Sequence, residues 1–430
     1  MFMHLDLDCF FVSAHRTIDK SLHNIAVAVG GRSNLSIFSN EKKNRNVTSN
    51  SGAFVSNILT NDSKSTFENY FKDSDGRIRG IITTSSYEAR AYGVKTAMSV
   101  SQALDLCPHL IVLPPNYPLY HDLSCRLKLL LEKEIPLIEQ FSIDEFFGDL
   151  RGYKNEDEVY EFAKFLQNKI LKELRLPISI GISYTKYLSK LLTEYAKPCN
   201  IKFVKKDEIR DFIKDIPIDD FPGIGKGFSL RLKKNGIRKL GQVQKNKELF
   251  YSWKKPGIDL YNRICGGNDF ELRVQTRKKS IGISRTFDAV YDREEVKRRI
   301  NILCRYLTFL VEKEKFNPQT YYIKFKYESK IKCKHNEKVN SVFNEFDFKK
   351  KMIEIFCKLD THKFHGIIFL NISVYNFSEK NSYVSNIFSQ EEDKKKRDLS
   401  NQIQKLRSKF GIDILKFANE IESISKIQKR

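Results

Sequence analysis

Apolar residues occur along the chain in short runs, and most runs are followed by a segment with helical spacing. Residues 1–14 predict a strand that leads into a helix, and residues 80–94 repeat this order. Residues 138–150 contain two strand-like runs that meet at Ile143–Glu145, a pattern that indicates a β-hairpin. The first part of the chain therefore predicts strands and helices mixed in one domain.

The later part of the chain changes pattern twice. A helix is expected at residues 156–174, a strand at 176–183 and a helix at 186–196 that ends at a proline. Residues 207–271 show helical spacing alone, and strand and helix alternate again over residues 280–375. Together these patterns predict an α+β multidomain protein.

Three stretches are too polar to form a core. Residues 33–80 are rich in Asn, Ser, Lys and Asp, which predicts an insertion or a long loop. The basic residues 273–279 predict a linker. After residue 375 a polar tail follows, in which the charged run 391–397 is expected to precede a last helical segment.

The charge balance indicates a polyanionic partner. The 430 residues carry a formal net charge of +22, which favours nucleic acid, although a generally basic proteome would give the same balance. The mean hydropathy is −0.44, and no apolar run has the length of a membrane span. The N-terminus does not have the pattern of a signal peptide. The eight cysteines form no C-x-x-C pair, which favours reduced thiols in a cytoplasmic protein.

Four acidic residues lie inside apolar runs. Asp6 and Asp8 are two apart on a predicted strand, so their side chains share a face, unless the strand ends there and both reach solvent. Asp144 and Glu145 are adjacent, and adjacent strand residues converge only at a turn or bulge. A cluster of carboxylates is relieved by a hard divalent cation such as Mg²⁺. The sequence does not show that residues 6 and 144 meet.

Two further segments are candidates for phosphate contacts. Thr84, Tyr87 and Arg90 follow a predicted strand at a helix N-terminus, and Lys197 follows a later helix; surface positions explain these residues equally well. Phe221–Lys226 predicts a Gly-rich hairpin between helices, with Leu230, Leu232 and Ile237 as packing positions, which is typical of a helix-hairpin-helix that binds DNA backbone. A plain glycine turn is the alternative.

Six segments occur in the order found in a known family: DLDCFF, SSYEARAYGVKTAMSVSQA, SIDEFFGDL, GISYTKYLSKLLTEYAKP, FPGIGKG and KKSIGISRTF. From residue 3 to about residue 290 the chain thus resembles the Y-family DNA polymerases. The resemblance implies a right-hand architecture whose parts are a palm (1–10 and 117–205), fingers (11–116, with the insertion at about 33–80), a thumb (206–272), a linker (273–280), a DNA-binding little finger (281–375) and a C-terminal tail (376–430). The insertion is longer than the corresponding loop of the compact family members.

The resemblance also implies roles for single residues. The catalytic metal ligands would be Asp6, the Leu7 backbone carbonyl, Asp144 and Glu145, with Asp8 and Ser142 in support. Phe11 would exclude a ribose 2′-OH, whereas its neighbours alone favour a core phenylalanine. Contacts to the incoming nucleotide would come from Thr84, Tyr87, Arg90 and Lys197, and contacts to DNA from Gly223, Gly225 and Lys226.

The implied activity is error-prone translesion DNA synthesis by two-metal nucleotidyl transfer from a dNTP to a primer 3′-OH. The cofactor would be two Mg²⁺ ions, for which Mn²⁺ can substitute, and the partners would be primer–template DNA and dNTP. No exonuclease-like set of acids lies outside the palm, so no proofreading is expected. Ile387 and Phe388 partly match a sliding-clamp peptide whose leading Gln is absent.

Two other functions remain open on the sequence. A nucleotidyl cyclase shares a palm-type carboxylate site but needs neither the hairpin at Gly223–Lys226 nor a basic C-terminal domain. A polymerase-like DNA-binding scaffold without catalysis would have no need for intact Asp6, Asp144 and Glu145.

Overall fold

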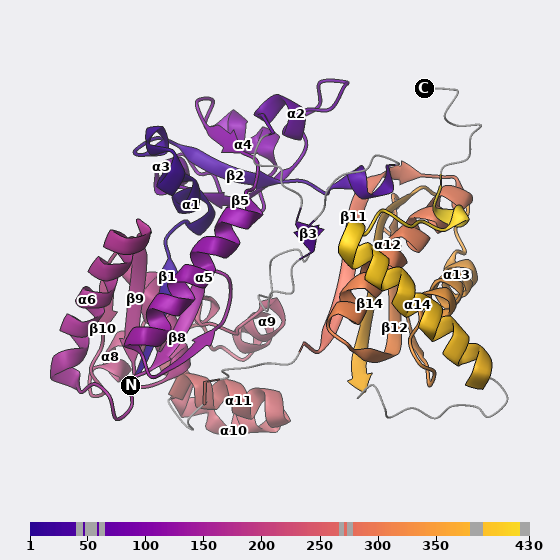
Figure 1. Ribbon diagram of the computed structural model, residues 1–430. Helices are drawn as coiled ribbons and strands as arrows, with labels where there is room; N and C mark the ends of the chain where they lie inside the picture. The colour runs from indigo at the N-terminus through magenta and orange to yellow at the C-terminus, as the bar shows by residue number, and fades with distance from the viewer. Residues whose placement is uncertain are drawn as a thin grey trace. The chain divides into compact units, whose positions relative to one another are not determined.

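The computed structural model describes residues 1–39, 46–47, 58–59, 65–265, 271–272, 278–378 and 390–421. These residues form two compact units. The N-terminal unit contains residues 1–31 and 65–272 of this set, and the C-terminal unit contains the rest. Figure 1 shows the elements of both units.

The N-terminal unit is built on a five-stranded sheet with the order β10-β9-β1-β8-β7. The strands are β1 (Phe2–Leu7), β7 (Leu137–Gln140), β8 (Glu145–Asp149), β9 (Ile178–Ser183) and β10 (Ile201–Phe203). The central strand β1 runs antiparallel to both β8 and β9, and all six of its residues are buried. The hairpin expected around Ile143–Glu145 is confirmed, since β7 and β8 pair antiparallel.

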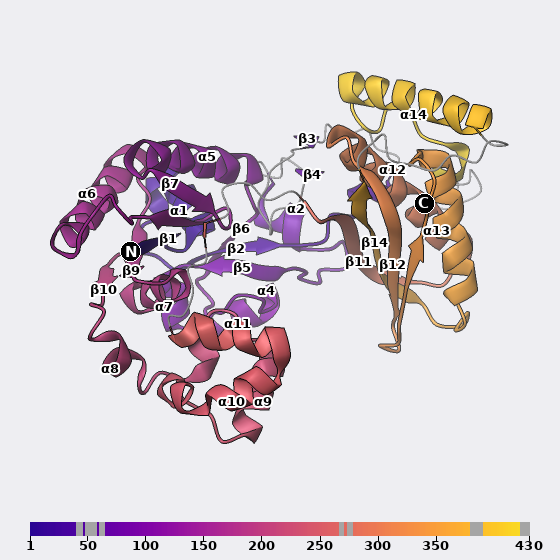
Figure 2. The same cartoon turned by 90° about the horizontal axis from the view of Figure 1, so that it is seen from below.

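Helices cover both faces of this sheet. On one face, α5 (Tyr117–Glu134) and α6 (Glu156–Leu174) pack against Met3, Leu5 and Leu7, the odd positions of β1. On the other face, α7 (Lys186–Ala196) contacts His4, whose Nδ1 lies 2.9 Å from Thr193 Oγ1. Figure 2 shows α5 and α6 on one side and α7 on the other. Because side chains alternate along a strand, Asp6 lies on the α7 face.

A second, three-stranded sheet carries the segments after β1. It has the order β5-β2-β6, and its strands are β2 (Val27–Gly31), β5 (Ile81–Ser85) and β6 (Ile111–Leu113). The associated helices are α1 (Phe10–Ile18), α2 (Phe67–Phe71), α3 (Tyr87–Ala91) and α4 (Val100–Leu106). Side chains of α2, α3 and α4 share one buried cluster with the sheet.

Residues 209–265 contain helices joined by turns and no strand, as the pattern predicted. The helices are α8 (Ile209–Ile213), α9 (Lys226–Lys234), α10 (Lys247–Ser252) and α11 (Lys254–Cys265). Their core includes Phe221, Leu232 and Ile237. The expectation that Leu230 packs there is wrong, because its side chain is 63% exposed. Leu230 lies two residues from Leu232, too far around a helix to share its buried face.

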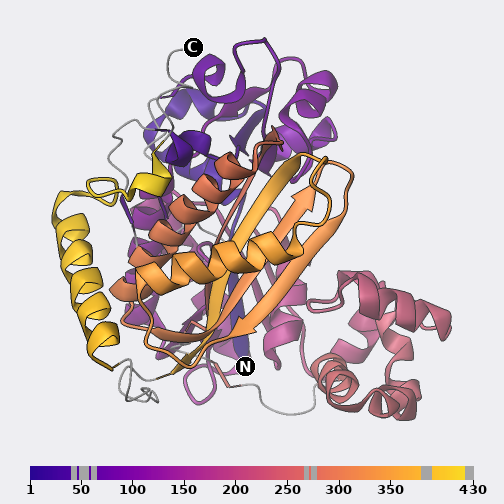
Figure 3. The same cartoon turned by 90° about the vertical axis from the view of Figure 1, so that its right-hand side faces the viewer.

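The C-terminal unit is a four-stranded antiparallel sheet covered by two helices. Its order is β11-β14-β12-β13, and its elements are β11 (Ser280–Val290), β12 (Asn317–Tyr327), β13 (Lys332–Lys338), β14 (Ile367–Ser378), α12 (Arg293–Lys313) and α13 (Glu345–Leu359). Figure 3 shows α12 and α13 on the same face of the sheet. Alternate residues of β12, such as Ile323 and Phe325, are buried beneath them.

The end of the chain belongs to this core. The charged run 391–397 was expected before the last helix, but it lies within α14 (Gln390–Phe410). Arg407 of α14 forms a fully buried ion pair with Glu345 of α13. Lys349 pairs with Glu345 and also with Glu420, so the segment after α14 returns to the same helix. Each buried charge therefore has a partner of opposite sign, as burial requires.

A segment that follows β2 in the sequence also packs in the C-terminal unit. The 3-10 helix η2 (Leu35–Phe38) buries Ile37 and Phe38 in the core of that unit. Both guanidinium NH₂ groups of Arg298 donate to the Phe38 carbonyl at 3.0 Å. Only the ends of the polar stretch 33–80 and two short strands, β3 (Asn46–Val47) and β4 (Ile58–Leu59), are among the described residues.

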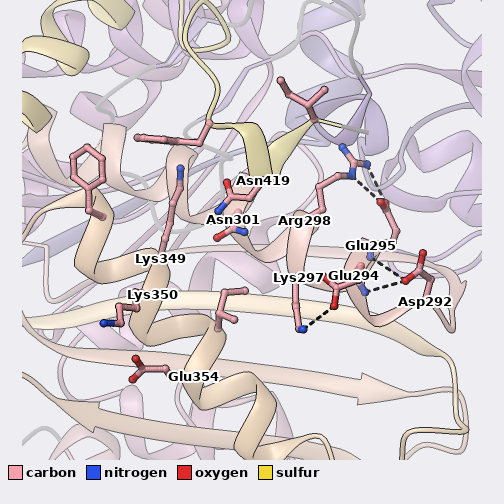
Figure 4. Close-up of a pocket in the computed structure, with 14 residues that line it drawn as sticks. Asp292, Glu294, Glu295, Lys297, Arg298, Asn301, Lys349, Lys350, Glu354 and Asn419 are labelled. Carbon is pink, nitrogen blue, oxygen red and sulfur yellow. Dashed lines mark hydrogen bonds and ion pairs between the residues drawn. The ribbon is translucent and has the colours of Figure 1, made fainter. Parts of the chain in front are cut away.

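A pocket of about 810 Å³ lies between α12, α13 and the chain end. Figure 4 shows that the charged groups on α12 pair with one another. Lys297 contacts Glu294 at 2.8 Å, and Arg298 contacts Glu295 at 2.6 Å. The pocket therefore does not present charge of a single sign, and it contains none of the residues predicted for catalysis.

No helix among the described residues is both long enough and apolar enough to cross a bilayer.

Candidate active site

Asp6 and Glu145 face each other across neighbouring strands. They are register partners in the antiparallel pair of β1 and β8, so their side chains leave the same face of the sheet. Asp6 is the fifth residue of β1, and Glu145 is the first residue of β8. Two acids that are 139 positions apart in the sequence are thus brought together by strand register.

Asp144 joins them from the turn between β7 and β8. Its backbone carbonyl accepts a hydrogen bond from the Leu7 amide at 3.1 Å. The Ser142 hydroxyl donates to the Asp144 carboxylate, and Ser142 Oγ accepts from the Glu145 amide at 3.1 Å. Ser142 therefore fixes the turn, and the turn removes the strand alternation that would send Asp144 to the opposite face.

Burial and like charge act on these carboxylates together. Burial raises the pKa of Asp6 to about 8; Lys197 opposes this shift, and the negative charges of Glu145 and Asp144 reinforce it. Burial also raises the pKa of Asp144, although the hydrogen bond from Ser142 lowers it. Since a raised carboxyl pKa means that the charged form is costly, the site favours a bound cation.

Two lysines approach the carboxylates from the α7 side. Lys197, directly after α7, lies 3.0 Å from Asp6 and 2.8 Å from Glu194. Lys190 of α7 forms an ion pair with Glu145. Lys190 was not predicted from the sequence, although Lys186 and Lys190 lie one turn apart on a helix, and that spacing places both on one face.

Lys186 was also missed. It forms a buried ion pair with Glu139 of β7 at 2.5 Å, and both side chains are 9% exposed. Its ammonium group lies 4.6 Å from the centre of the Phe147 ring, which adds a cation–π contact. This pair holds α7 against the β7–β8 hairpin. It thereby helps to place Lys190, one turn further along α7, beside Glu145.

Within the described residues, no three His, Cys, Asp or Glu side chains already form a metal-binding group. The donors nonetheless fit a hard cation. Asp6, Asp144 and Glu145 supply carboxylate oxygens, and the pKa of Asp6 is raised partly by its two neighbours. Oxygen ligands of this kind are those that Mg²⁺ and Mn²⁺ take in proteins.

The Asp8 carboxylate accepts hydrogen bonds from three other parts of the chain. It accepts from the Tyr87 hydroxyl at 2.9 Å, from the Ser179 hydroxyl at 3.0 Å and from the Cys199 amide at 2.7 Å. Asp8 therefore connects β1 to α3, to β9 and to the turn after Lys197. Its side chain fastens two predicted nucleotide-contacting segments to the sheet.

The predicted nucleotide contacts lie around this connection. Thr84 is in β5, and Tyr87 opens α3 after the N-cap Ser86. Arg90 donates to the Ser85 carbonyl at 3.1 Å, and its guanidinium lies 4.9 Å from the centre of the Tyr87 ring. Phe11 of α1 and Tyr87 pack against the same buried cluster.

Known proteins match both units of the chain. The impB/mucB/samB family matches residues 56–194, and the C-terminal domain of the same family matches residues 278–386. DNA polymerase IV of Bacillus anthracis is 28% identical over 429 residues, which cover 97% of this chain and 93% of that protein. DNA polymerase IV of Streptococcus pneumoniae serotype 2 is 30% identical over 254 residues, which cover 58% of this chain and 72% of that protein.

The chain belongs to the impB/mucB/samB family of Y-family DNA polymerases.

Solved structures agree with this assignment at the level of the fold. A Y-family DNA polymerase chimera of Dbh and Dpo4 superposes with a TM-score of 0.69 at 20% identity, covering 88% of this chain and 99% of the other. The insertion ternary complex of Dbh DNA polymerase gives a TM-score of 0.56 at 18% identity, with the same coverage. The right-hand α+β architecture expected from the resemblance is confirmed.

As a Y-family polymerase, the chain is a DNA-directed DNA polymerase, and the nucleotidyl cyclase and inactive-scaffold alternatives are not favoured. Its predicted DNA hairpin is exposed. Gly223 has a φ of +98°, which a residue without a Cβ adopts easily, and Gly225 caps α9. Lys226, the first residue of α9, is exposed.

The predicted clamp residues of this Y-family polymerase, Ile387 and Phe388, lie outside the described residues.

Proposed function

We propose that this polymerase carries out error-tolerant synthesis across damaged template, without proofreading. A primer 3′-OH would attack the α-phosphate of a dNTP paired to the template base, and pyrophosphate would leave. The observation that carries the nucleotidyl transfer is the convergence of Asp6, Asp144 and Glu145 through the β1–β8 register and the Leu7–Asp144 backbone bond. The lesion-bypass role is supported by the similarity to DNA polymerase IV. Positioning and charge stabilisation would supply most of the rate.

Two Mg²⁺ ions are proposed as the cofactor, with Mn²⁺ able to substitute. The ligands would be the carboxylates of Asp6, Asp144 and Glu145 and the backbone carbonyl of Leu7. Bound there, the ions would make the primer hydroxyl a better nucleophile and stabilise the leaving oxygen. The raised pKa of Asp6 supports the assignment, because a carboxyl that is costly to ionise alone gains most from a cation.

The triphosphate is proposed to contact Thr84, Tyr87, Arg90 and Lys197. The support for Lys197 is its position 3.0 Å from Asp6, which places a cation beside the proposed metal ligands. The Asp8 carboxylate accepts a hydrogen bond from the Tyr87 hydroxyl at 2.9 Å, which fixes the position of this proposed nucleotide contact relative to β1. Phe11 is proposed to exclude the 2′-OH of a ribonucleotide.

The proposed layout follows the prediction from the sequence, except that η2 and the segment from α14 onward pack in the core of the C-terminal unit. The palm would comprise residues 1–10 and 117–205, the fingers 11–116, the thumb 206–272 and the little finger 281–375. The exposed hairpin at Gly223, Gly225 and Lys226 would bind DNA backbone, supported by the net charge of +22.

Two further proposals concern partners and place. Ile387 and Phe388 are proposed to contact a sliding clamp, so deletion of Tyr383–Phe388 should abolish any stimulation of synthesis by the clamp. The cytoplasm is proposed as the location because the eight cysteines are all unpaired.

Extension on damaged DNA tests the proposed activity. The full chain with Mg²⁺ should extend a primer past an abasic site or a bulky base adduct in the template, and it should misinsert more often than a proofreading polymerase does. The same primer on undamaged template is the matched control. Synthesis that stops at every lesion of a small panel, while the undamaged template is copied, would contradict the translesion role.

A further inference from the structure

The ring of Phe11 rests on another aromatic ring from a distant part of the sequence. Phe11 lies in α1 and Tyr120 in α5, and their rings are stacked, with centroids 4.3 Å apart and planes 14° from parallel. Tyr120 is completely buried, whereas Phe11 remains partly exposed. One face of the Phe11 ring is thus covered by Tyr120.

Tyr120 itself is held on several sides. Its hydroxyl shares a hydrogen bond of 2.8 Å with Nε2 of His15, one turn after Phe11 on α1. The rings of Phe10 and Tyr117 lie 6.0 Å and 5.9 Å from the Tyr120 ring. α1 and α5 are therefore connected through Tyr120 by one stacking contact and one hydrogen bond.

The hydrogen bond joins two neutral groups. Burial lowers the pKa of His15 to about 4, and burial also raises the pKa of Tyr120. Both side chains are consequently uncharged over the neutral pH range. The bond orients the Tyr120 ring without placing a charge behind the Phe11 ring.

Sugar selection by an aromatic ring depends on how far the ring can move away from the incoming sugar. Repulsion between atoms rises steeply with approach, so a ring that can tilt away admits an additional oxygen. Tyr120 is stacked on one face of the Phe11 ring and so limits movement of the ring toward that side. A buried aliphatic residue would fill part of the space, but it would lack both the flat stacking face and the bond to His15. A phenylalanine would keep the stacking face.

We propose that Tyr120 is a positioning residue for sugar selection, acting through the Phe11 ring and not by touching the nucleotide. The inference rests on the proposed role of Phe11 as the group that excludes the 2′-OH. Tyr120 thereby determines how strongly the polymerase discriminates deoxyribonucleotides from ribonucleotides.

The test compares kcat/KM for a dNTP and the matching rNTP on undamaged primer–template with Mg²⁺. Tyr120→Leu should reduce the discrimination ratio by about tenfold, the upper end of what stacking between two rings contributes. Tyr120→Phe keeps the ring and should stay close to the wild-type ratio. Tyr160→Leu, which changes a tyrosine on the surface of α6 that is 40% exposed, is the control for loss of an aromatic ring.

A double variant separates positioning from a general packing defect. If Tyr120 acts through Phe11, then Tyr120→Leu should change the ratio no further in a Phe11→Ala background. Should Tyr120→Leu fail to fold, as judged by circular dichroism, Tyr120→Met makes the same comparison with a flexible side chain.

The results separate the role of Tyr120 from the role of Phe11 on which it depends. A wild-type ratio in Phe11→Ala would remove the sugar gate itself. A loss of discrimination in Phe11→Ala together with a wild-type ratio in Tyr120→Leu, or in Tyr120→Met where the leucine variant does not fold, would leave the gate in place and overturn the role of Tyr120. Equal losses in Tyr120→Phe and Tyr120→Leu would also overturn it, because the stacked ring would then not matter.

Discussion

His15 is a partly buried group that contributes to the pH sensitivity of the N-terminal unit. Its imidazole is partly covered between α1 and α5 and shares a hydrogen bond with Tyr120. The pKa of His15 falls to about 4 because burial disfavours the charged ring, whereas an unfolded histidine has a pKa of about 6.5. The unfolded chain therefore binds more protons than the folded chain between these two values.

The prediction is that the N-terminal unit loses stability as the pH falls from about 6.5 toward about 4. At pH 5 the penalty from His15 is at most about 2 kcal/mol, and it is smaller to the extent that the ring is exposed. Hydrogen exchange of the α1 amides at pH 7.5 and pH 5 measures it. His15→Gln keeps a hydrogen-bonding side chain but does not titrate, so its α1 amides should lose less protection between pH 7.5 and pH 5 than those of the wild type. Equal losses in both proteins would show that His15 does not cause the pH dependence.

At this scale the sequence predicted which residues could do chemistry but not how they meet. Asp6 and Glu145 are opposite each other only because β1 pairs with β8 in one register, and a shift of one residue would send Glu145 to the other face. Lys190 was missed because a lysine on an amphipathic helix ordinarily points to solvent. Only the packing of α7 on the Asp6 face of the sheet brings it to Glu145.

At the scale of elements, the packing of η2 in the C-terminal unit was not predicted from the sequence. Residues 33–80 are polar enough to predict a loop, and Ile37 and Phe38 are too few to predict a core. In the structure both side chains are buried in the C-terminal unit, where Arg299 lies 4.9 Å from the Phe38 ring centre and Arg298 binds its carbonyl. A pair of apolar residues in a polar segment can thus anchor it to a distant element.

Phe38→Asp should weaken the C-terminal unit, because a carboxylate would replace an apolar ring in its core. The expected loss is roughly 3 kcal/mol or more, within the range for large core truncations and buried charges. Hydrogen exchange of the α12 amides reports the loss, since Arg298 and Arg299 of α12 contact Phe38. Phe364→Asp is the matched control, as the Phe364 side chain is 97% exposed. Unchanged α12 protection in Phe38→Asp would show that η2 does not stabilise this unit.

At the scale of the whole molecule, the net charge of +22 favoured a polyanionic partner such as nucleic acid. The alternation of strands and helices predicted an α+β protein, and this architecture is confirmed. What the pattern did not show is that the C-terminal segment is part of the core. Its charges pair with buried partners, Arg407 with Glu345 and Arg305 with Asp413, and a charged run gives no sign of such partners in the sequence.

Salt dependence tests the contribution of charge to DNA binding. The logarithm of the affinity for primer–template DNA should fall linearly with the logarithm of the salt concentration. Lys226→Ala should reduce the magnitude of this slope by about one, because one phosphate contact is lost. Lys164→Ala changes a lysine of α6 that pairs with Glu161, and it should leave the slope unaltered. An unchanged slope in Lys226→Ala would exclude Lys226 from the DNA contact.

Primer extension with Mg²⁺ tests most directly whether Asp6, Asp144 and Glu145 form one catalytic centre. Wild-type protein should add deoxynucleotides to a primer on an undamaged template, and Asp144→Ala should reduce kcat by about a thousandfold or more, as removal of a catalytic group does. Asp122→Ala, at an acid on α5 that is 64% exposed, should retain wild-type activity. No incorporation by the wild type, or full activity in Asp144→Ala, would contradict the account.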